Sequence, residues 1–427
     1  MTPTSLIQYI LDGKLDTRLI GLYGKDQLDA QKTRYISAIE SFTKLYGNER
    51  EASIFSVSGR SELSGNHTDH NHGCVIACSI NLDIIAVASK RNDAIIRVKS
   101  EGYDEIIVDT EKYNIPDTSL FGTSSSIIAG MCQGFAKSGF ATGGFDAYMT
   151  SNVLKGSGLS SSAAFEDMIG NILNYFYNNG AVDNVEIAKL SRYAENVFFG
   201  KPCGLMDQVA CAHGGIVAID FEDTSAPKIE KMDFDLTAAG YKLCIVDTGG
   251  NHADLTDDYA AIPTEMKSIA KYFGKSVLRK VSEDDIIANI PALRESFGDR
   301  AILRALHFIS ENARVAIQKK ALSDGNLPLY FENVIASGKS SFCYLQNVYT
   351  TKNVTEQGLS LALALAERYL DGKSGAYRVH GGGFAGTIQA YVKSEDADGF
   401  ASLMNSAFGD GACLVLQIRQ ESATKII

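Results

Sequence analysis

The chain has 427 residues, of which 45% are hydrophobic and 21% are charged. A single hydrophobic core stops growing at roughly 250–300 residues, so this length predicts two domains. The net charge of −11 at pH 7 excludes a protein that coats the phosphates of nucleic acid, and we expect no nucleic-acid partner.

The amino-terminal segment 1–18 carries only a short apolar run, which Asp12 and Lys14 interrupt. It therefore predicts neither a signal peptide nor a membrane anchor, and we expect a cytoplasmic protein without membrane contact, as a monomer or weak homo-oligomer. The eight cysteines include no CxxC pair. We expect them to be reduced and mostly buried.

The amino-terminal half alternates between helical and strand-like patterns. Apolar residues at three-and-four spacing predict a helix over residues 28–46 that ends at Gly47. Short β-rich runs separated by turn-like residues then predict strands at 54–58, 75–80, 84–88 and 95–98. The pattern indicates a mixed sheet rather than a helical bundle.

Helical periodicity returns at 163–177 and 185–198, followed by strand-like runs at 216–221 and 243–246. The polar stretch 222–235 between those runs is the best candidate for a domain boundary, which we place near residue 232. Further along the chain, we expect helices at 300–322 and 355–370 and a strand at 389–392.

A glycine- and serine-rich loop, residues 154–164 (LKGSGLSSSAA), leads directly into a predicted helix. Its glycines allow close approach of the backbone, and the helix amino terminus favours anionic oxygens, so the loop suits a polyphosphate. A serine hydroxyl there could also bind Mg²⁺. The loop does not match GxxxxGK[ST], and a simple Ser/Gly helix start remains the alternative.

The segment 59–73 (GRSELSGNHTDHNHG) concentrates hydrogen-bonding side chains between two predicted strands. Convergent donors and acceptors of this kind suit the recognition of a polyol. Its three closely spaced histidines also leave a zinc site open, which we favour less because no partner cluster of Cys or His occurs elsewhere.

Two further segments carry possible chemistry. In residues 194–208 (AENVFFGKPCGLMDQ), Glu195 and Asp207 could divide the tasks of holding a cation and facing a substrate hydroxyl. Residues 381–386 (GGGFAG) satisfy GxGxxG, but the residues after them alternate like a strand. We therefore interpret that motif as a glycine turn and not as a dinucleotide-binding loop.

In this order, the four segments resemble the motifs of the galactokinases, a branch of the GHMP kinase family. They are similar to its sugar-binding signature, phosphate loop, catalytic segment and carboxy-terminal glycine motif, at residues 59–73, 154–164, 194–208 and 375–387. The resemblance implies an α+β fold of two domains, 1–232 and 233–427, with the active site in the cleft between them. It also implies transfer of the γ-phosphoryl group of MgATP to the anomeric C1 hydroxyl of a hexose, most of all galactose.

The resemblance assigns a role to each matching residue. Asp207 is the catalytic aspartate and Arg60 is the arginine that keeps it ionised. Ser162 and Glu195 hold Mg²⁺. The phosphates of ATP are cradled by Gly156, Ser157, Gly158, Leu159, Ser160, Ser161 and Ser162. The sugar contacts are Asn66, His67, Asp69, Gly204 and Tyr259.

Asn66 is the main departure from the family signature, which has a glutamate at this position that contacts the sugar 6-hydroxyl. A neutral amide there would weaken one hydrogen bond by about 1 kcal/mol. It would also tolerate a carboxylate at C6, so a uronic acid is an alternative substrate, as is another hexose or a hexosamine. An alternative of another class is a non-catalytic protein that binds sugar and ATP to regulate a partner, but the retained Asp207 and Arg60 favour turnover.

Overall fold

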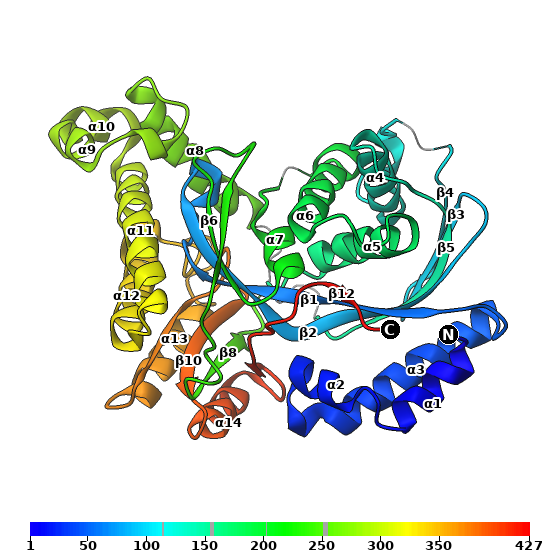
Figure 1. Cartoon of the computed structure of the whole chain (residues 1–427). Helices are drawn as coiled ribbons and strands as arrows, with labels where there is room; N and C mark the ends of the chain where they lie inside the picture. Colours follow the sequence, from blue (N-terminus) through cyan, green and yellow to red (C-terminus); the bar gives the residue numbers. More distant parts are fainter. Residues whose placement is uncertain (113–114, 154–157, 202, 251–254) are drawn as a thin grey trace.

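The computed structural model describes the chain except for residues 113–114, 154–157, 202 and 251–254, and it contains two β-sheets with helices packed against them (Figure 1). The larger sheet has eight strands and the smaller one has four, within the described residues. None of the described helices has the length and apolar character that crossing a bilayer requires.

The larger sheet has the order β12-β1-β2-β5-β3-β4, with β6 on β2 and β7 on β6. Its strands are β1 Ser53–Ser64, β2 Cys74–Lys90, β3 Ile95–Ser100, β4 Glu105–Asp109, β5 Phe145–Ser151, β6 Ile216–Asp220, β7 Lys228–Met232 and β12 Thr424–Lys425. All of these strands except β12 precede residue 233.

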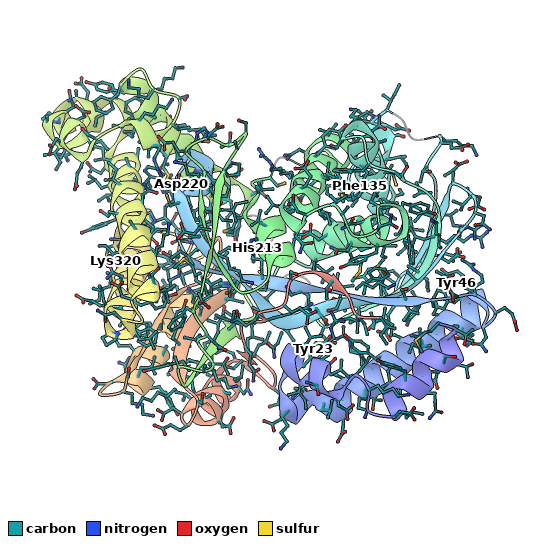
Figure 2. All side chains as sticks on the ribbon, in the orientation of Figure 1. Tyr23, Tyr46, Phe135, His213, Asp220 and Lys320 are labelled. Carbon is teal, nitrogen blue, oxygen red and sulfur yellow. The ribbon has the colours of Figure 1, made fainter. Side chains whose placement is uncertain are left out.

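Helices cover both faces of this sheet (Figure 1). They are α1 Pro3–Leu11, α2 Asp16–Tyr23, α3 Leu28–Tyr46, α4 Ser124–Lys137, α5 Ser161–Tyr177, α6 Asn184–Tyr193 and α7 Met206–His213. Alternate residues of β1 point to opposite faces, so Ile54 packs against α1–α3 whereas Phe55 packs against α5. In Figure 2, Tyr23 and Phe135 mark the two helical layers on either side of the sheet.

The smaller sheet has the antiparallel order β11-β8-β10-β9. Its strands are β8 Tyr241–Asp247, β9 Gly375–Val379, β10 Thr387–Lys393 and β11 Cys413–Leu416. The remaining helices are α8 Thr256–Tyr272, α9 Glu283–Ala288, α10 Ile290–Phe297, α11 Asp299–Ser323, α12 Leu327–Ser340, α13 Gly358–Leu370 and α14 Ala397–Phe408. Helix α12 packs on one face of the sheet, and α13 and α14 pack on the other.

Strand β2 is one continuous strand of 17 residues, where the sequence predicted two strands separated by a turn. The turn-like residue Asp83 is fully buried within it. Its carboxylate accepts hydrogen bonds from Tyr23 at 2.5 Å and from Arg34 at 2.7 Å. The prediction of a break was wrong because a buried ion pair satisfies a side chain that would otherwise favour a solvent-exposed turn.

Strand β2 also contributes to three hydrophobic cores. Val75 and Ala77 belong to the core beneath α4–α7, and Ile76 and Cys78 belong to the core shared with the smaller sheet. Further along, Val87 belongs to the core beneath α1–α3. The strand therefore connects all the layers around the larger sheet.

Most predicted elements are confirmed. The helix at 28–46 is α3, and Gly47 follows it with a φ of +86°; the helices near 163–177 and 300–322 are α5 and α11. The predicted helix at 185–198 is divided into α6 and a π-helix, Ala194–Phe199. The strand predicted at 389–392 lies in β10, which directly follows the glycine turn 381–386.

The polar stretch 222–235 is not a structureless linker, because it contains β7, which pairs with β6. The predicted domain limit at residue 232 falls between the last residue of β7 and the first residue of β8. The division into 1–232 and 233–427 stays a prediction, and β12 returns from the second segment to pair with β1.

Candidate active site

A bulge in β1 brings this strand against the glycine- and serine-rich loop. The pairing of β1 with β2 shifts register between Ser58 and Arg60. At Gly59, an added Cβ would lie 2.8 Å from the carbonyl oxygen of Leu159. The Arg60 backbone N–H donates to that same oxygen at 3.0 Å. A residue without a side chain is therefore required where the two segments meet.

Arg60 and Asp207 form a paired ionic contact beside this loop. Arg60 Nε donates to Asp207 Oδ1 at 2.8 Å, and Arg60 Nη2 donates to Oδ2 at 2.7 Å. The remaining Nη1 donates to the carbonyl oxygen of Gly158. Burial raises the pKa of Asp207, but the charge and hydrogen bonds of Arg60 bring it below its ordinary value. Asp207 is thus a carboxylate, with its side chain 35% exposed in the first turn of α7.

The described part of the predicted phosphate loop surrounds this pair. Ser160, which precedes α5 and has a φ of +58°, donates its hydroxyl to Asp207 Oδ2 at 2.5 Å. Ser161 and Ser162 form the first turn of α5, and Leu159 is buried. Gly156 and Ser157 lie outside the described residues.

Glu166 in α5 and Glu195 in the π-helix lie close together, because both contact Gln208 of α7. Gln208 Nε2 donates to Glu195 Oε2 at 2.9 Å and to Glu166 Oε2 at 3.2 Å. The other oxygen of Glu195 contacts Lys201 Nζ at 3.1 Å. Burial, and then the charge of Glu195, raises the pKa of Glu166 well above its ordinary value.

This group fits a hard divalent cation. Gln208 is 2% exposed, and its Oε1 atom has no hydrogen-bond partner among the described residues. The carboxylates of Glu166 and Glu195 and the hydroxyl of Ser162, which line one cavity, are the kinds of oxygen ligand that Mg²⁺ prefers. Within the described residues, no group of three or more His, Cys, Asp or Glu side chains is arranged to hold a metal ion.

A cavity of about 790 Å³ opens next to Ser162 and Glu195. Its lining comes from β2–β5, α4, α5 and the π-helix, which all precede residue 202. The apolar lining residues include Ile106, Ile127, Met149, Phe165 and Phe199. A mostly apolar cavity that ends at hydroxyl and carboxylate groups has the composition of a small-molecule site.

The predicted sugar contacts come from both halves of the chain. His67 Nε2 lies 3.0 Å from the carbonyl oxygen of Gly382, and the Tyr259 hydroxyl donates to the carbonyl oxygen of Gly383 at 2.7 Å. A Cβ at Gly204 would lie 3.0 Å from Asp69 Oδ2. Burial, with the charge of Glu62 adding to it, raises the pKa of Asp69.

Known kinases resemble this chain over most of its length. Residues 40–90 match the galactokinase galactose-binding signature, and residues 125–215 match the N-terminal domain of the GHMP kinases. The galactokinase of Streptomyces coelicolor is 31% identical over 377 residues, which cover 86% of this chain and 92% of that protein. This chain belongs to the galactokinase family. The galactokinase of Lactobacillus helveticus is 30% identical over 372 residues, covering 85% and 91%.

Solved structures agree with this family assignment and confirm the predicted fold. The structure of Lactococcus lactis galactokinase complexed with galactose has a TM-score of 0.76 at 25% identity, and the match covers 92% of this chain and 100% of that one. The mevalonate kinase of Methanococcus jannaschii shares the fold alone, with a TM-score of 0.61 at 15% identity over 86% of this chain and 98% of that one. The chain is therefore a sugar kinase of two-domain α+β architecture.

Asn66, where the sequence analysis expects a departure from the galactokinase signature, has no exposed surface. Its Nδ2 donates to the carbonyl oxygen of Gly381 at 2.6 Å and to Glu62 at 3.3 Å. Its Oδ1 accepts from Asn347 at 2.9 Å and from Ser341 at 3.3 Å. The amide of Asn66 is thus hydrogen-bonded to protein groups on both its nitrogen and its oxygen, and its contact with the sugar stays a prediction.

A buried charged network that the sequence analysis missed supports the sugar signature. Arg378 is fully buried in β9 and pairs with Glu62, and its Nη1 lies 3.5 Å from Glu311. Burial raises the pKa of Glu311, but the charges of His307, Arg314 and Arg378 lower it to about 2. A charged residue within the otherwise apolar pattern of β9 was the available signal, because a buried charge needs a partner.

Proposed function

We propose that this chain is a galactokinase that transfers the γ-phosphoryl group of ATP to the anomeric C1 hydroxyl of galactose. The observation that carries the proposal is the contact between Arg60 and Asp207. Through it, Asp207 is bonded to the segment of the sugar signature, and through Ser160 it is bonded to the loop that leads into α5. A carboxylate held ionised at this position can accept a hydroxyl proton as the phosphoryl group approaches.

In the proposed reaction, Asp207 orients the C1 hydroxyl and takes its proton. Arg60 keeps Asp207 ionised and stabilises the negative charge on the transferred group. Transfer is direct and in line, without a covalent enzyme intermediate, so that positioning and electrostatics supply most of the acceleration. Ser160 fixes Asp207 from the side of the nucleotide.

ATP would enter the 790 Å³ cavity with its base against the apolar lining and its phosphates toward the start of α5. The backbone of the loop and the positive end of α5 favour phosphate oxygens there. The hydroxyl of Ser162 and the carboxylate of Glu195 would hold Mg²⁺, which neutralises phosphate charge when it is bound.

For the sugar, we propose contacts with His67, Asp69, the backbone at Gly204 and Tyr259. Their hydrogen-bonding groups come from η2 (Asp69–Asn71), α8 and the loops around them. We assign Asn66 a positioning role, since its amide connects the signature to Gly381 and Asn347. With the predicted domain division near residue 232, these contacts would come from both domains.

A coupled assay of ADP release tests the proposal with galactose, N-acetylgalactosamine, glucose, arabinose and galacturonate. We expect galactose to give the highest kcat/KM, and NMR of the product to show phosphate at C1. Release of ADP with galacturonate but not with galactose would show that galactose is not the substrate. Sugar binding by calorimetry without ADP release from any sugar would instead indicate a non-catalytic regulator.

A further inference from the structure

Lys201 is the one basic side chain among the described residues that line the cavity. We infer that Lys201 binds the terminal phosphates of ATP. In the free chain, its ammonium group contacts Glu195 Oε1, and a divalent cation would replace it at this oxygen when the nucleotide binds. The inference rests on the proposed function, because it requires ATP to enter this cavity.

The chain turns sharply to bring Lys201 to Glu195. Gly200, with a φ of +79°, ends the π-helix, and the Lys201 backbone N–H donates to the Glu195 carbonyl oxygen at 3.1 Å. The side chain then places Nζ 3.1 Å from Glu195 Oε1, while Gln208 holds Oε2 at 2.9 Å. One oxygen of Glu195 is therefore attached to a buried amide and the other to a cation on a flexible stem.

The charge of the cavity creates the need for this cation. The acidic residues in the described lining are Glu101, Asp104, Glu105, Glu166 and Glu195. A polyphosphate that enters such a lining is repelled unless positive charge faces it. Arg60 cannot meet this need alone, because its guanidinium is already bonded to Asp207 and to the carbonyl oxygen of Gly158.

A divalent cation can replace the ammonium group of Lys201 at Glu195. The side chain of Lys201 is 62% exposed, whereas that of Glu195 is 5% exposed. The four-carbon stem of lysine is flexible, so the exposed ammonium group can turn away from Glu195. A divalent cation on Glu195 would repel the ammonium group toward the phosphates.

A purely structural ion pair is the competing explanation, and it predicts a loss of stability without a change in nucleotide affinity.

Calorimetry on the full chain with Lys201→Met, which removes the charge and keeps the length, separates these explanations. We expect MgATP to bind this variant at least about tenfold more weakly, because a charged hydrogen bond is lost. Adenosine, which has no phosphate, should bind equally to both proteins. Lys189→Met is the matched control, because Lys189 pairs with Glu186 at 3.4 Å on α6 outside the cavity lining, and it should change neither affinity.

The exchange at Glu195 has its own readout. Mn²⁺ alone, followed by electron paramagnetic resonance, should bind Lys201→Met more tightly than wild type, because no ammonium group competes for Glu195. Unchanged MgATP affinity, equal losses for adenosine and MgATP, or unchanged Mn²⁺ affinity would each overturn the inference. A wild-type chain that binds neither adenosine nor MgATP would overturn the proposed function instead.

Discussion

The hydroxyl of Ser160 donates to Asp207 Oδ2 at 2.5 Å, and Arg60 Nη2 contacts the same oxygen at 2.7 Å. Ser160 is the last residue before α5 and adopts a left-handed conformation. The loop that leads to the cavity and the carboxylate beside the sugar signature are thus one hydrogen-bonded unit. A nucleotide that moves this loop also moves Asp207.

Replacing Asp207 with Asn should remove the proton acceptor while keeping its shape and its contact with Ser160. We expect kcat to fall about 10²–10⁴-fold, the usual contribution of a general base. MgATP should still bind measurably in a calorimetric titration, since the cavity is unchanged. A variant with near-normal kcat would show that Asp207 is not the catalytic base.

Replacing Asn66 with Glu, the residue that the sequence analysis expects in the family signature, should destabilise this chain. The new carboxylate would lie against Glu62 and the carbonyl oxygen of Gly381, in a position with no exposed surface. An unpaired buried charge of this kind costs about 3 kcal/mol or more of unfolding free energy, which urea denaturation would measure. The control is Asn92→Glu at an exposed position. A stable Asn66→Glu variant with a raised preference for galactose over galacturonate would instead show that residue 66 faces the sugar.

Replacing Asp83 with Asn should weaken the attachment of α1–α3 to the larger sheet. Asp83 and Arg419 are both fully buried, and Arg34 lies 2.7 Å from Asp83. Breaking a buried ion pair costs about 3–5 kcal/mol, and urea unfolding at pH 7 should show this loss. Asp324→Asn, which breaks an exposed pair with Lys320, should change the unfolding free energy by less than about 1 kcal/mol.

The pH dependence of that difference follows from the pKa of Asp83. Burial raises this pKa, but Arg34 and Arg419 hold it below its ordinary value. The ion pair therefore stabilises the chain fully above the unfolded pKa of about 4, and this stability is lost as the pH falls through the lower folded value. The difference in unfolding free energy between wild type and Asp83→Asn should therefore become smaller below pH ~4.

Asp167 should behave in the opposite way. It is fully buried, Ser191 donates to its Oδ1 at 2.7 Å, and its Oδ2 has no partner among the described residues. Burial raises its pKa well above the ordinary value. The folded chain thus binds this proton more tightly than the unfolded chain, and stability falls as the pH rises above about 4.

Replacing Asp167 with Asn removes this titration. We expect the unfolding free energy of the variant to equal that of wild type near pH 4 and to be about 1–3 kcal/mol higher at pH 8. At pH 8, wild type must either bury the charge of Asp167 or bind a proton there, and the asparagine requires neither. Thermal unfolding across pH 4–8 measures the difference. Equal pH dependence of the two proteins would show that Asp167 is neutralised by another route.

The local elements of the fold were predictable from the sequence where one physical signal dominates. The spacing of apolar residues located α3, α5 and α11, and the alternating residues after the glycine turn located β10. The break predicted near Asp83 failed because its burial depends on Arg34 and Arg419, which lie far away in the chain. Sequence spacing alone contains no such information.

The candidate site shows the same division. Motifs singled out Arg60 and Asp207, but only the fold shows that the Gly59 bulge brings Leu159 into contact with β1. The meeting of Lys201 with Glu195 depends on the turn at Gly200, and the pairing of Arg378 with Glu62 depends on the packing of β9. Contacts between distant segments require the tertiary structure, whatever the strength of the motifs.

Strand β2 has a consequence for how the molecule holds together. Its residues belong to three separate cores, including the one that the two sheets share. If either half unfolded, apolar residues of β2 would become exposed to water. We therefore expect the two halves to unfold together, in one cooperative transition. Rigid-body opening of the two halves would expose the face of β2 that carries Ile76 and Cys78, which lie in the shared core, and we expect such opening to be costly.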